Sequence, residues 1–307
     1  MPLPSDEKIL ALSQDLIAQF DKMFGPNPGF RPAHAKGVLL QGEFIPSTEA
    51  ANLSIAPHFQ GKPTQVTARF SNSTGLPLVP DNHHNANPRG LAIRFHLGEH
   101  VHTDIVSHST DGFPTRTGAE FLEFLHAVTG SAPIDEFFAG HPAALAFAQI
   151  PKPAPASFVT EQYFGVTAME FINAAGQRRF GRYRITPELG IHHLSAGEAA
   201  ALSPNYLVDG LLSTIATGQP LAFRLQVQLA EPGDIVDDAT IHWPATRVIE
   251  DLGGIVLTHA VPDDAAAQKH IIFDPIPRVK GIEPSNDPLL ELRAAIYLIS
   301  GRRRRSI

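Results

Sequence analysis

Two residues near the C-terminal end of the chain could together create a metal ligand. Arg293 and Tyr297 are four positions apart, so they share one face if the segment is helical. A guanidinium beside a phenol favours the phenolate, which is a hard oxygen ligand for ferric iron, including haem iron. Because an isolated pair with this spacing is more often a surface arginine beside a packed tyrosine, the pattern needs support from other segments.

A histidine and a serine in the N-terminal third could form an acid–base pair. His34 lies within the segment 31–37 (RPAHAKG), and Ser71 ends the segment 68–71 (ARFS). A serine hydroxyl that bonds one imidazole nitrogen fixes the tautomer of the ring. Each segment is also common in ordinary strands, so neither identifies a site alone.

The elements that must position these residues follow from hydrophobic periodicity and capping signals. Residues 5–24 have an amphipathic helical pattern, with Ser5 as N-cap and Gly25 as terminator. Capping boxes open helices at 117–126 and at 195–217. A final helix, with Asp287 as cap and its end at Gly301, carries Arg293 and Tyr297. Strands are expected at 37–44, 64–71, 90–97, 169–173, 178–186, 221–229 and 253–261.

The strands do not alternate regularly with helices, which predicts an α+β protein. An antiparallel sheet or barrel with helices added at its ends is the favoured architecture. The sequence shows no internal repeat and no long flexible linker, so residues 1–307 are expected to form one domain.

Composition excludes several classes of protein. The 307 residues are 43% hydrophobic and 18% charged, which is incompatible with a disordered chain or a fibre. The net charge of -7 gives a nucleic-acid partner no electrostatic support. No apolar run approaches the ~18 residues of a membrane span, and the N-terminus has no signal-peptide pattern. There is no cysteine, so thiol catalysis and thiolate metal sites are excluded.

Seven phrases in the chain resemble the haem catalases, and more closely the short catalase-related peroxidases. In the family's order they are 31–37 (RPAHAKG), 68–71 (ARFS), 87–95 (NPRGLAIRF), 104–110 (DIVSHST), 164–176 (FGVTAMEFINAAG), 242–244 (HWP) and 273–297 (FDPIPRVKGIEPSNDPLLELRAAIY). The resemblance extends from Arg31 to Arg304. It implies a closed antiparallel eight-stranded β-barrel with helical additions that holds haem b.

The resemblance also implies a role for each candidate residue. His34 matches the distal histidine, the general base that moves a peroxide proton, and Ser71 matches its hydrogen-bond partner. Tyr297 matches the proximal tyrosinate that ligates the haem iron, the form of ligation found in catalases, and Arg293 matches the arginine that keeps it ionised. The remaining haem-binding matches are Arg31, Arg69 and Arg304, which pair with the propionates, and Phe121, which stacks near the haem.

Several positions depart from the pattern of full-length catalases. His108 aligns with the distal asparagine, with Ser109 as the alternative replacement. Asn87 stands in place of a channel aspartate, Ser73 in place of a narrowing valine, and Arg184 in place of a histidine. Because dismutation requires a second peroxide to be oriented, these departures favour peroxidase over catalase turnover. We also expect a single catalase-like domain without the C-terminal helical region of ordinary catalases.

The resemblance thus implies a haem peroxidase that reduces hydrogen peroxide or an organic hydroperoxide with an organic electron donor, with weak catalase activity. One alternative is a fatty-acid hydroperoxide isomerase or lyase of the allene oxide synthase type, in which a threonine replaces Ala33. Another is a non-enzymatic haem carrier, which has no need of the His34–Ser71 pair. Without the resemblance, two pairs of adjacent histidines, His83–His84 and His192–His193, would be the first candidates for a non-haem metal site. We expect a cytoplasmic homo-oligomer, with a dimer favoured.

Overall fold

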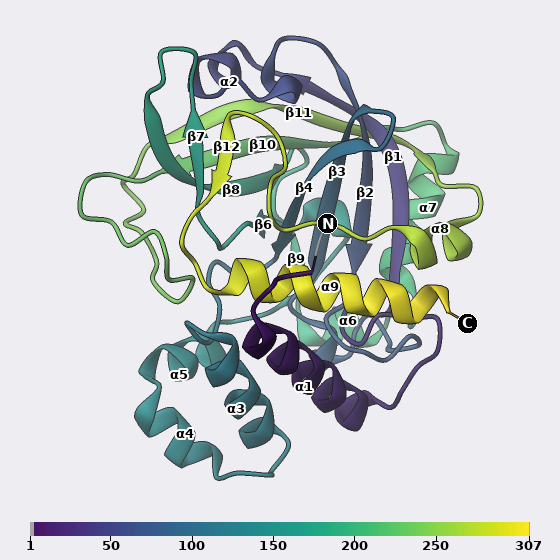
Figure 1. Cartoon of the computed structure of the whole chain (residues 1–307). Coiled ribbons are helices and arrows are strands. Elements are labelled where there is room, and N and C mark those ends of the chain that lie inside the picture. Colours follow the sequence, from purple (N-terminus) through teal and green to yellow (C-terminus); the bar gives the residue numbers. More distant parts are fainter. Residues whose placement is uncertain (1–2, 307) are drawn as a thin grey trace.

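Eight antiparallel strands close into a barrel in the computed structural model, which describes residues 3–306 (Figure 1). The hydrogen-bonded ring runs β10-β11-β1-β2-β3-β4-β6-β8 and closes through the pairing of β8 with β10. The strands are β1 (Gly37–Pro46), β2 (Thr64–Ser71), β3 (Gly90–Gly98), β4 (Val101–His108), β6 (Tyr163–Phe164), β8 (Arg178–Pro187), β10 (Leu221–Leu229) and β11 (Ile249–Ala260). This ring confirms the eight-stranded barrel expected from the sequence.

Four short strands extend this framework. β7 (Met169–Ile172) pairs with β8, and β12 (Ile282–Pro284) pairs with β7, so both continue the sheet beyond the ring. β5 (Ala154–Pro155) and β9 (His193–Leu194) form a separate ladder.

The helices lie outside the barrel. They are α1 (Glu7–Phe24), α2 (Thr48–Leu53), α3 (Gly118–Val128), α4 (Ile134–Gly140), α5 (Pro142–Gln149), α6 (Ala196–Ala200), α7 (Tyr206–Ala216), α8 (Asp264–His270) and α9 (Leu289–Arg305). Figure 1 shows α9 crossing one side of the barrel with α1 beside it and the group α3–α5 below. Leu16, Leu125 and Leu292 form the buried contact among α1, α3 and α9.

Alternation along β2, β3 and β4 separates the barrel core from an outer face. Ala68, Phe70, Ile93, Phe95 and Ile105 belong to the large cluster that fills the barrel. Because side chains of a strand alternate between the two faces, the intervening residues point outward, toward α9. The outward face of these three strands therefore forms one wall of the region that α9 covers.

Several element limits differ from the sequence-based expectations. Asp6, not Ser5, caps α1, because its carboxylate accepts the Lys8 N–H at 2.8 Å. The helix expected over 195–217 is two helices, since Pro204 lies in the segment between α6 and α7. The last helix continues past Gly301 to Arg305. Packing explains this glycine, because it is buried against Ile272, where a side chain would clash. The limits expected for β2 and β10 are confirmed.

Candidate functional site

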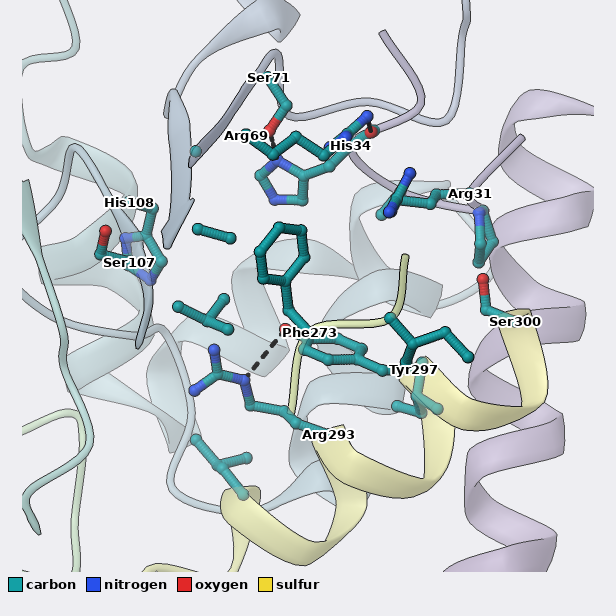
Figure 2. Close-up of a pocket in the computed structure, with 18 of the residues that line it drawn as sticks. Arg31, His34, Arg69, Ser71, Ser107, His108, Phe273, Arg293, Tyr297 and Ser300 are labelled. Carbon is teal, nitrogen blue, oxygen red and sulfur yellow. Dashed lines mark hydrogen bonds between the residues drawn. The ribbon is translucent and has the colours of Figure 1, made fainter. Parts of the chain in front are cut away.

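A cavity lies between the outward face of β2–β4 and helix α9. Residues of α1 and α3 close its sides, including Phe20 and Phe121. The nine residues that the resemblance places at the haem or the distal side all line this cavity: Arg31, His34, Arg69, Ser71, His108, Phe121, Arg293, Tyr297 and Arg304. The fold thus gathers segments from both ends of the chain around one space (Figure 2).

Two cross-strand rows form the barrel side of the cavity. Ser71, Gly90 and His108 are directly opposite one another on β2, β3 and β4. The next outward row on the same strands is Arg69, Ala92 and Val106. The side chains in one such row point to the same face of the sheet. Because the central strand contributes only Gly90 and Ala92, these rows leave a space between the larger side chains of β2 and β4.

His34 is held by three polar contacts in an uncommon backbone conformation. Its φ of 56° lies in the left-handed region, which non-glycine residues rarely adopt. The His34 N–H donates to the Ser73 carbonyl at 2.9 Å, and Arg69 Nη2 donates to the His34 carbonyl at 2.8 Å. The His34 Nδ1 atom lies 3.1 Å from Ser71 Oγ, which leaves Nε2 for the cavity.

The electrostatic surroundings keep the His34 ring neutral. Loss of hydration, together with the positive charge of Arg69, lowers the pKa of His34 to about 3. A neutral imidazole at ordinary pH can accept a proton. This is the protonation state that a general base requires.

Tyr297 and Arg293 face the same cavity from the opposite wall. Both belong to α9, and Arg293 Nε donates to the Tyr297 phenolic oxygen at 3.2 Å. Figure 2 shows this pair on α9 below the cavity and His34 with Ser71 above it. The expected helical pairing is therefore present, and the oxygen lies across the cavity from the His34 ring.

Three guanidinium groups converge at one end of the cavity. Arg31 donates to the Gln268 and Ile271 carbonyls, Arg69 donates to Gln268 Oε1, and Arg304 donates to Ile271 and to Ser300 Oγ. None of the three forms an ion pair with a carboxylate within residues 3–306. These cations are therefore held by neutral acceptors.

The three guanidinium groups repel one another, so this end of the cavity favours binding of an anion. Loss of hydration and the charges of Arg69 and Arg304 lower the pKa of Arg31. Burial and Arg304 lower the pKa of Arg69 to about 9, and burial with Arg305 lowers that of Arg304 to about 10. Because each cation destabilises its neighbours, carboxylate groups bound here would relieve the repulsion.

His108 and Phe121 occupy the other parts of the wall. The His108 Nδ1 atom lies 2.8 Å from Thr110 Oγ1, and loss of hydration together with Arg293 lowers the pKa of His108 to about 4. The Phe121 ring packs against Phe113, with ring centroids 4.9 Å apart. The cavity is therefore lined by two neutral imidazoles, those of His34 and His108, and by aromatic rings on another part of its wall.

The other three residues that depart from the catalase pattern, Asn87, Ser73 and Arg184, each form a polar contact in the structure. The Asn87 amide donates to the Lys152 carbonyl at 2.8 Å, and Asn87 is not among the lining residues. An aspartate at this position would lose that donor and face a carbonyl oxygen. Ser73 contributes the carbonyl that holds His34, and Arg184 Nη2 pairs with the Asp111 carboxylate at 2.9 Å.

Several residues of the cavity were not singled out from the sequence. They include Leu16 and Phe20 of α1, Gly90, Ala92, Ile272, Phe273 and Ser300. Gln268 on α8 is a further polar neighbour, because it accepts from Arg69 and donates to Asp264 Oδ2 at 2.6 Å. The amphipathic pattern of α1 identified its buried stripe but not the surface that it covers.

The histidine pairs considered for a metal site do not converge. His83 stacks on His84, with ring centroids 4.3 Å apart, and His193 pairs with Glu161. Across residues 3–306, no group of three or more His, Cys, Asp or Glu side chains is close enough to hold a metal ion. In the same range, no helix has the length and apolarity of a membrane span.

Comparisons with known proteins decide the family. The catalase family model matches residues 11–307. The chain belongs to the catalase family. Two relatives described as catalase-related peroxidases come from Synechococcus elongatus and Mycolicibacterium paratuberculosis. They are 33% and 32% identical and align over 94% and 92% of this chain and 87% and 91% of their own lengths.

Full-length catalases share the fold but extend beyond it. A fungal catalase structure superposes with a TM-score of 0.80 at 25% identity and covers 99% of this chain. The chain spans 64% of that protein and 62% of Catalase-A from Dictyostelium discoideum, to which it is 28% identical. Membership of this family makes the chain an oxidoreductase that acts on peroxide.

The cavity fits the haem that catalase-family proteins generally bind. The small row at Gly90 and Ala92 leaves room for a flat group between the barrel face and α9. The three guanidiniums without carboxylate partners match the two propionates of a haem, and Arg304 Nε is buried without a hydrogen-bond partner in the described structure. The Tyr297 phenolic oxygen, which accepts a hydrogen bond from Arg293, is a hard oxygen donor of the kind that binds ferric iron.

Proposed function

We propose that this chain is a haem b peroxidase that reduces hydrogen peroxide or an organic hydroperoxide at the expense of an organic electron donor, with weak dismutation. The observation that supports it best is the placement of a neutral His34 opposite Tyr297 across one cavity, with a cationic cluster at one end. Bound haem would supply the redox chemistry at iron.

The roles of the chain's own residues follow from their contacts. Tyr297 would ligate the iron, with its phenolate stabilised by Arg293. Arg31, Arg69 and Arg304 would bind the propionates, and Phe121 would pack near the ring. This arrangement would hold the cofactor between the two walls and shield it from bulk water.

His34 would move the proton that peroxide cleavage requires. Its Nδ1 atom is engaged by Ser71 Oγ, so Nε2 would take the proton from one peroxide oxygen and return it to the leaving oxygen. Arg69 supports this role indirectly, because it binds the His34 carbonyl and keeps the ring in place. His108 adds a second imidazole to the same cavity in place of an amide.

One assay separates peroxidase from catalase activity. The purified haem-loaded protein is mixed with hydrogen peroxide or cumene hydroperoxide, with and without an organic donor, while donor oxidation and oxygen release are recorded. The proposal expects donor oxidation to exceed oxygen release and expects His108→Asn to shift the balance toward oxygen. Vigorous oxygen release without donor oxidation would exclude a peroxidase and leave a catalase.

A further inference from the structure

A third cross-strand row continues the two rows that form the barrel side of the cavity. Thr67, Arg94 and Asp104 are directly opposite one another on β2, β3 and β4. Arg94 and Asp104 form a two-pronged ion pair, with Nε 2.9 Å from Oδ1 and Nη2 2.7 Å from Oδ2. The Asp104 side chain is fully buried, and none of the three residues lines the cavity.

This ion pair holds a segment of the chain that belongs to no helix or strand. Residues 271–274 follow α8 directly. Arg94 Nη2 donates to the Ile272 carbonyl, and the Asp274 N–H donates to Asp104 Oδ2 at 2.7 Å. Among the described residues, these are the only hydrogen bonds that join residues 272–274 to the strands of the barrel.

The same segment contacts the cationic cluster of the cavity. The Ile271 carbonyl accepts from Arg31 Nη2 at 3.0 Å and from Arg304 Nη2 at 3.1 Å. The Phe273 ring, with the Arg94 guanidinium 5.4 Å from its centroid, lines the cavity (Figure 2). A displacement of the segment would therefore move the acceptor that two of the three guanidinium groups share.

We propose that Asp104, through its pair with Arg94, is a positioning residue for the binding of the haem carboxylates. The inference rests on the proposed haem-dependent function and extends it to a residue outside the cavity. Asp104 fixes segment 271–274, and the segment holds the Ile271 carbonyl that orients two of the three cavity arginines. A carboxylate suits this role because the guanidinium fork fixes both the distance and the direction of the contact.

A second carboxylate with the same kind of contacts supplies a matched control. Asp234 accepts from Arg247 Nε at 2.8 Å, from Arg247 Nη2 at 2.9 Å and from the Glu231 N–H at 2.7 Å. None of these residues lines the cavity. Asp234→Asn therefore removes one negative charge from an equivalent arrangement and leaves the cavity segment unaltered.

Transfer of haem to apomyoglobin measures how well the protein retains the cofactor. Asp104→Asn should accelerate transfer by roughly 10-fold, the scale of one hydrogen bond to a charged group. Asp234→Asn should transfer haem at the wild-type rate. Haem dimethyl ester, whose two propionates are esterified, gives the cationic cluster no carboxylate to bind, so Asp104→Asn should leave the transfer rate of the ester nearly unchanged.

Hydrogen–deuterium exchange of the apoprotein examines the segment without haem. Asp104→Asn replaces one carboxylate oxygen by an amino group that cannot accept, so the Asp274 amide should exchange faster, while amides of β10 keep their wild-type rates. If this variant does not fold, Arg94→Lys carries the test. A lysine lacks the planar fork that contacts Asp104 and Ile272 together, so Arg94→Lys should also speed the transfer of haem and not that of its ester.

The outcomes separate this inference from the proposed function. Equal acceleration with haem and with its dimethyl ester would overturn the inference, because the pair would then support packing alone. Equal acceleration in Asp104→Asn and Asp234→Asn, or wild-type transfer and exchange in Asp104→Asn, would also overturn it. In all three cases the peroxidase assignment stands. If the wild-type apoprotein takes up no haem, the proposed function fails and the inference with it.

Discussion

The His34 ring lies directly over Gly90, the residue that separates Ser71 from His108 across three strands. A Cβ atom at Gly90 would lie 2.9 Å from His34 Nδ1 and 2.6 Å from Ser71 Oγ. The backbone conformation does not require glycine here, because the φ of Gly90 lies outside the left-handed region. The close approach of the His34 ring and Ser71 Oγ is what requires it. The absence of a side chain at one strand position thus creates the space for the acid–base pair.

Gly90→Ala should therefore impair catalysis more than folding. The added methyl group must displace Ser71 Oγ or the imidazole, and a small displacement of a reacting group can cost about 10²-fold in rate. We expect haem binding to be retained and the rate of peroxide consumption to fall by that order. Gly98→Ala, on the same strand, is the control because its Cβ would meet nothing nearer than 3.8 Å. Equal activity in the two variants would contradict the account.

His34→Ala should keep the cofactor and lose the reaction with peroxide. The imidazole is the group that accepts and returns the proton, so its removal should slow the reaction by roughly 10²–10⁴-fold. Stopped-flow absorption after mixing with hydrogen peroxide measures the rate. Ser71→Ala should have a smaller effect, because it removes only the partner of Nδ1. A wild-type rate in His34→Ala would show that the histidine is structural.

Tyr297→Phe should change the absorption spectrum of the ferric protein and weaken haem retention. The substitution removes the only oxygen of the side chain while leaving the ring that packs in α9. Tyr206→Phe is a suitable control, because that phenol donates to the Pro155 carbonyl on another part of the surface. An unchanged spectrum with full haem occupancy in Tyr297→Phe would refute the assigned ligand.

Gln268→Glu should weaken retention of an anionic cofactor. The new carboxylate would lie against Arg69 and neutralise one of the three cations that favour propionates. It would also lie close to Asp264 Oδ2, which the present amide contacts at 2.6 Å. We expect faster transfer of haem to apomyoglobin. Gln177→Glu, at an exposed turn, should leave the transfer rate unchanged.

Sequence reasoning identified the site better than its supporting groups. The Arg293–Tyr297 spacing is local, so one helical turn brings the two side chains together wherever the helix lies. The barrel was recognisable because strands such as 221–229 alternate strictly between apolar and polar residues. Gln268 was not recognisable, since its contact with Arg69 joins positions 199 residues apart and depends on where α8 docks.

Gly301 illustrates the opposite error. A glycine near the end of a helical pattern is a typical terminator, and the sequence offers no sign of a close neighbour. In the structure, tertiary packing against Ile272 explains this glycine, and the helix continues for another turn. That extra turn places Arg304 in the cavity wall, so the local rule would have separated the residue from its site.

A buried histidine in the barrel predicts sensitivity to acid. His58 is 1% exposed and lies among Phe44, Phe59 and Phe95, and its Nδ1 atom has no hydrogen-bond partner in the described structure. Burial lowers the pKa of His58 to about 3, from an ordinary value of 6.5. In the unfolded chain the ring takes up a proton below pH 6.5, whereas in the folded chain it stays neutral. The folded state therefore loses stability as the pH falls from about 6.5 toward 3.

Replacing His58 with a side chain that does not titrate should reduce this acid sensitivity. Between pH 6.5 and pH 5, one such histidine costs about 2 kcal/mol of unfolding free energy, since each pH unit corresponds to about 1.4 kcal/mol. Urea unfolding at pH 7.5 and at pH 5 measures the change for the wild type and for His58→Gln. The variant should lose about 2 kcal/mol less on acidification, even where its stability at pH 7.5 is lower. His100→Gln, at an exposed site, should behave like the wild type. An identical pH dependence in His58→Gln would show that the ring is already protonated, or solvated, in the folded barrel.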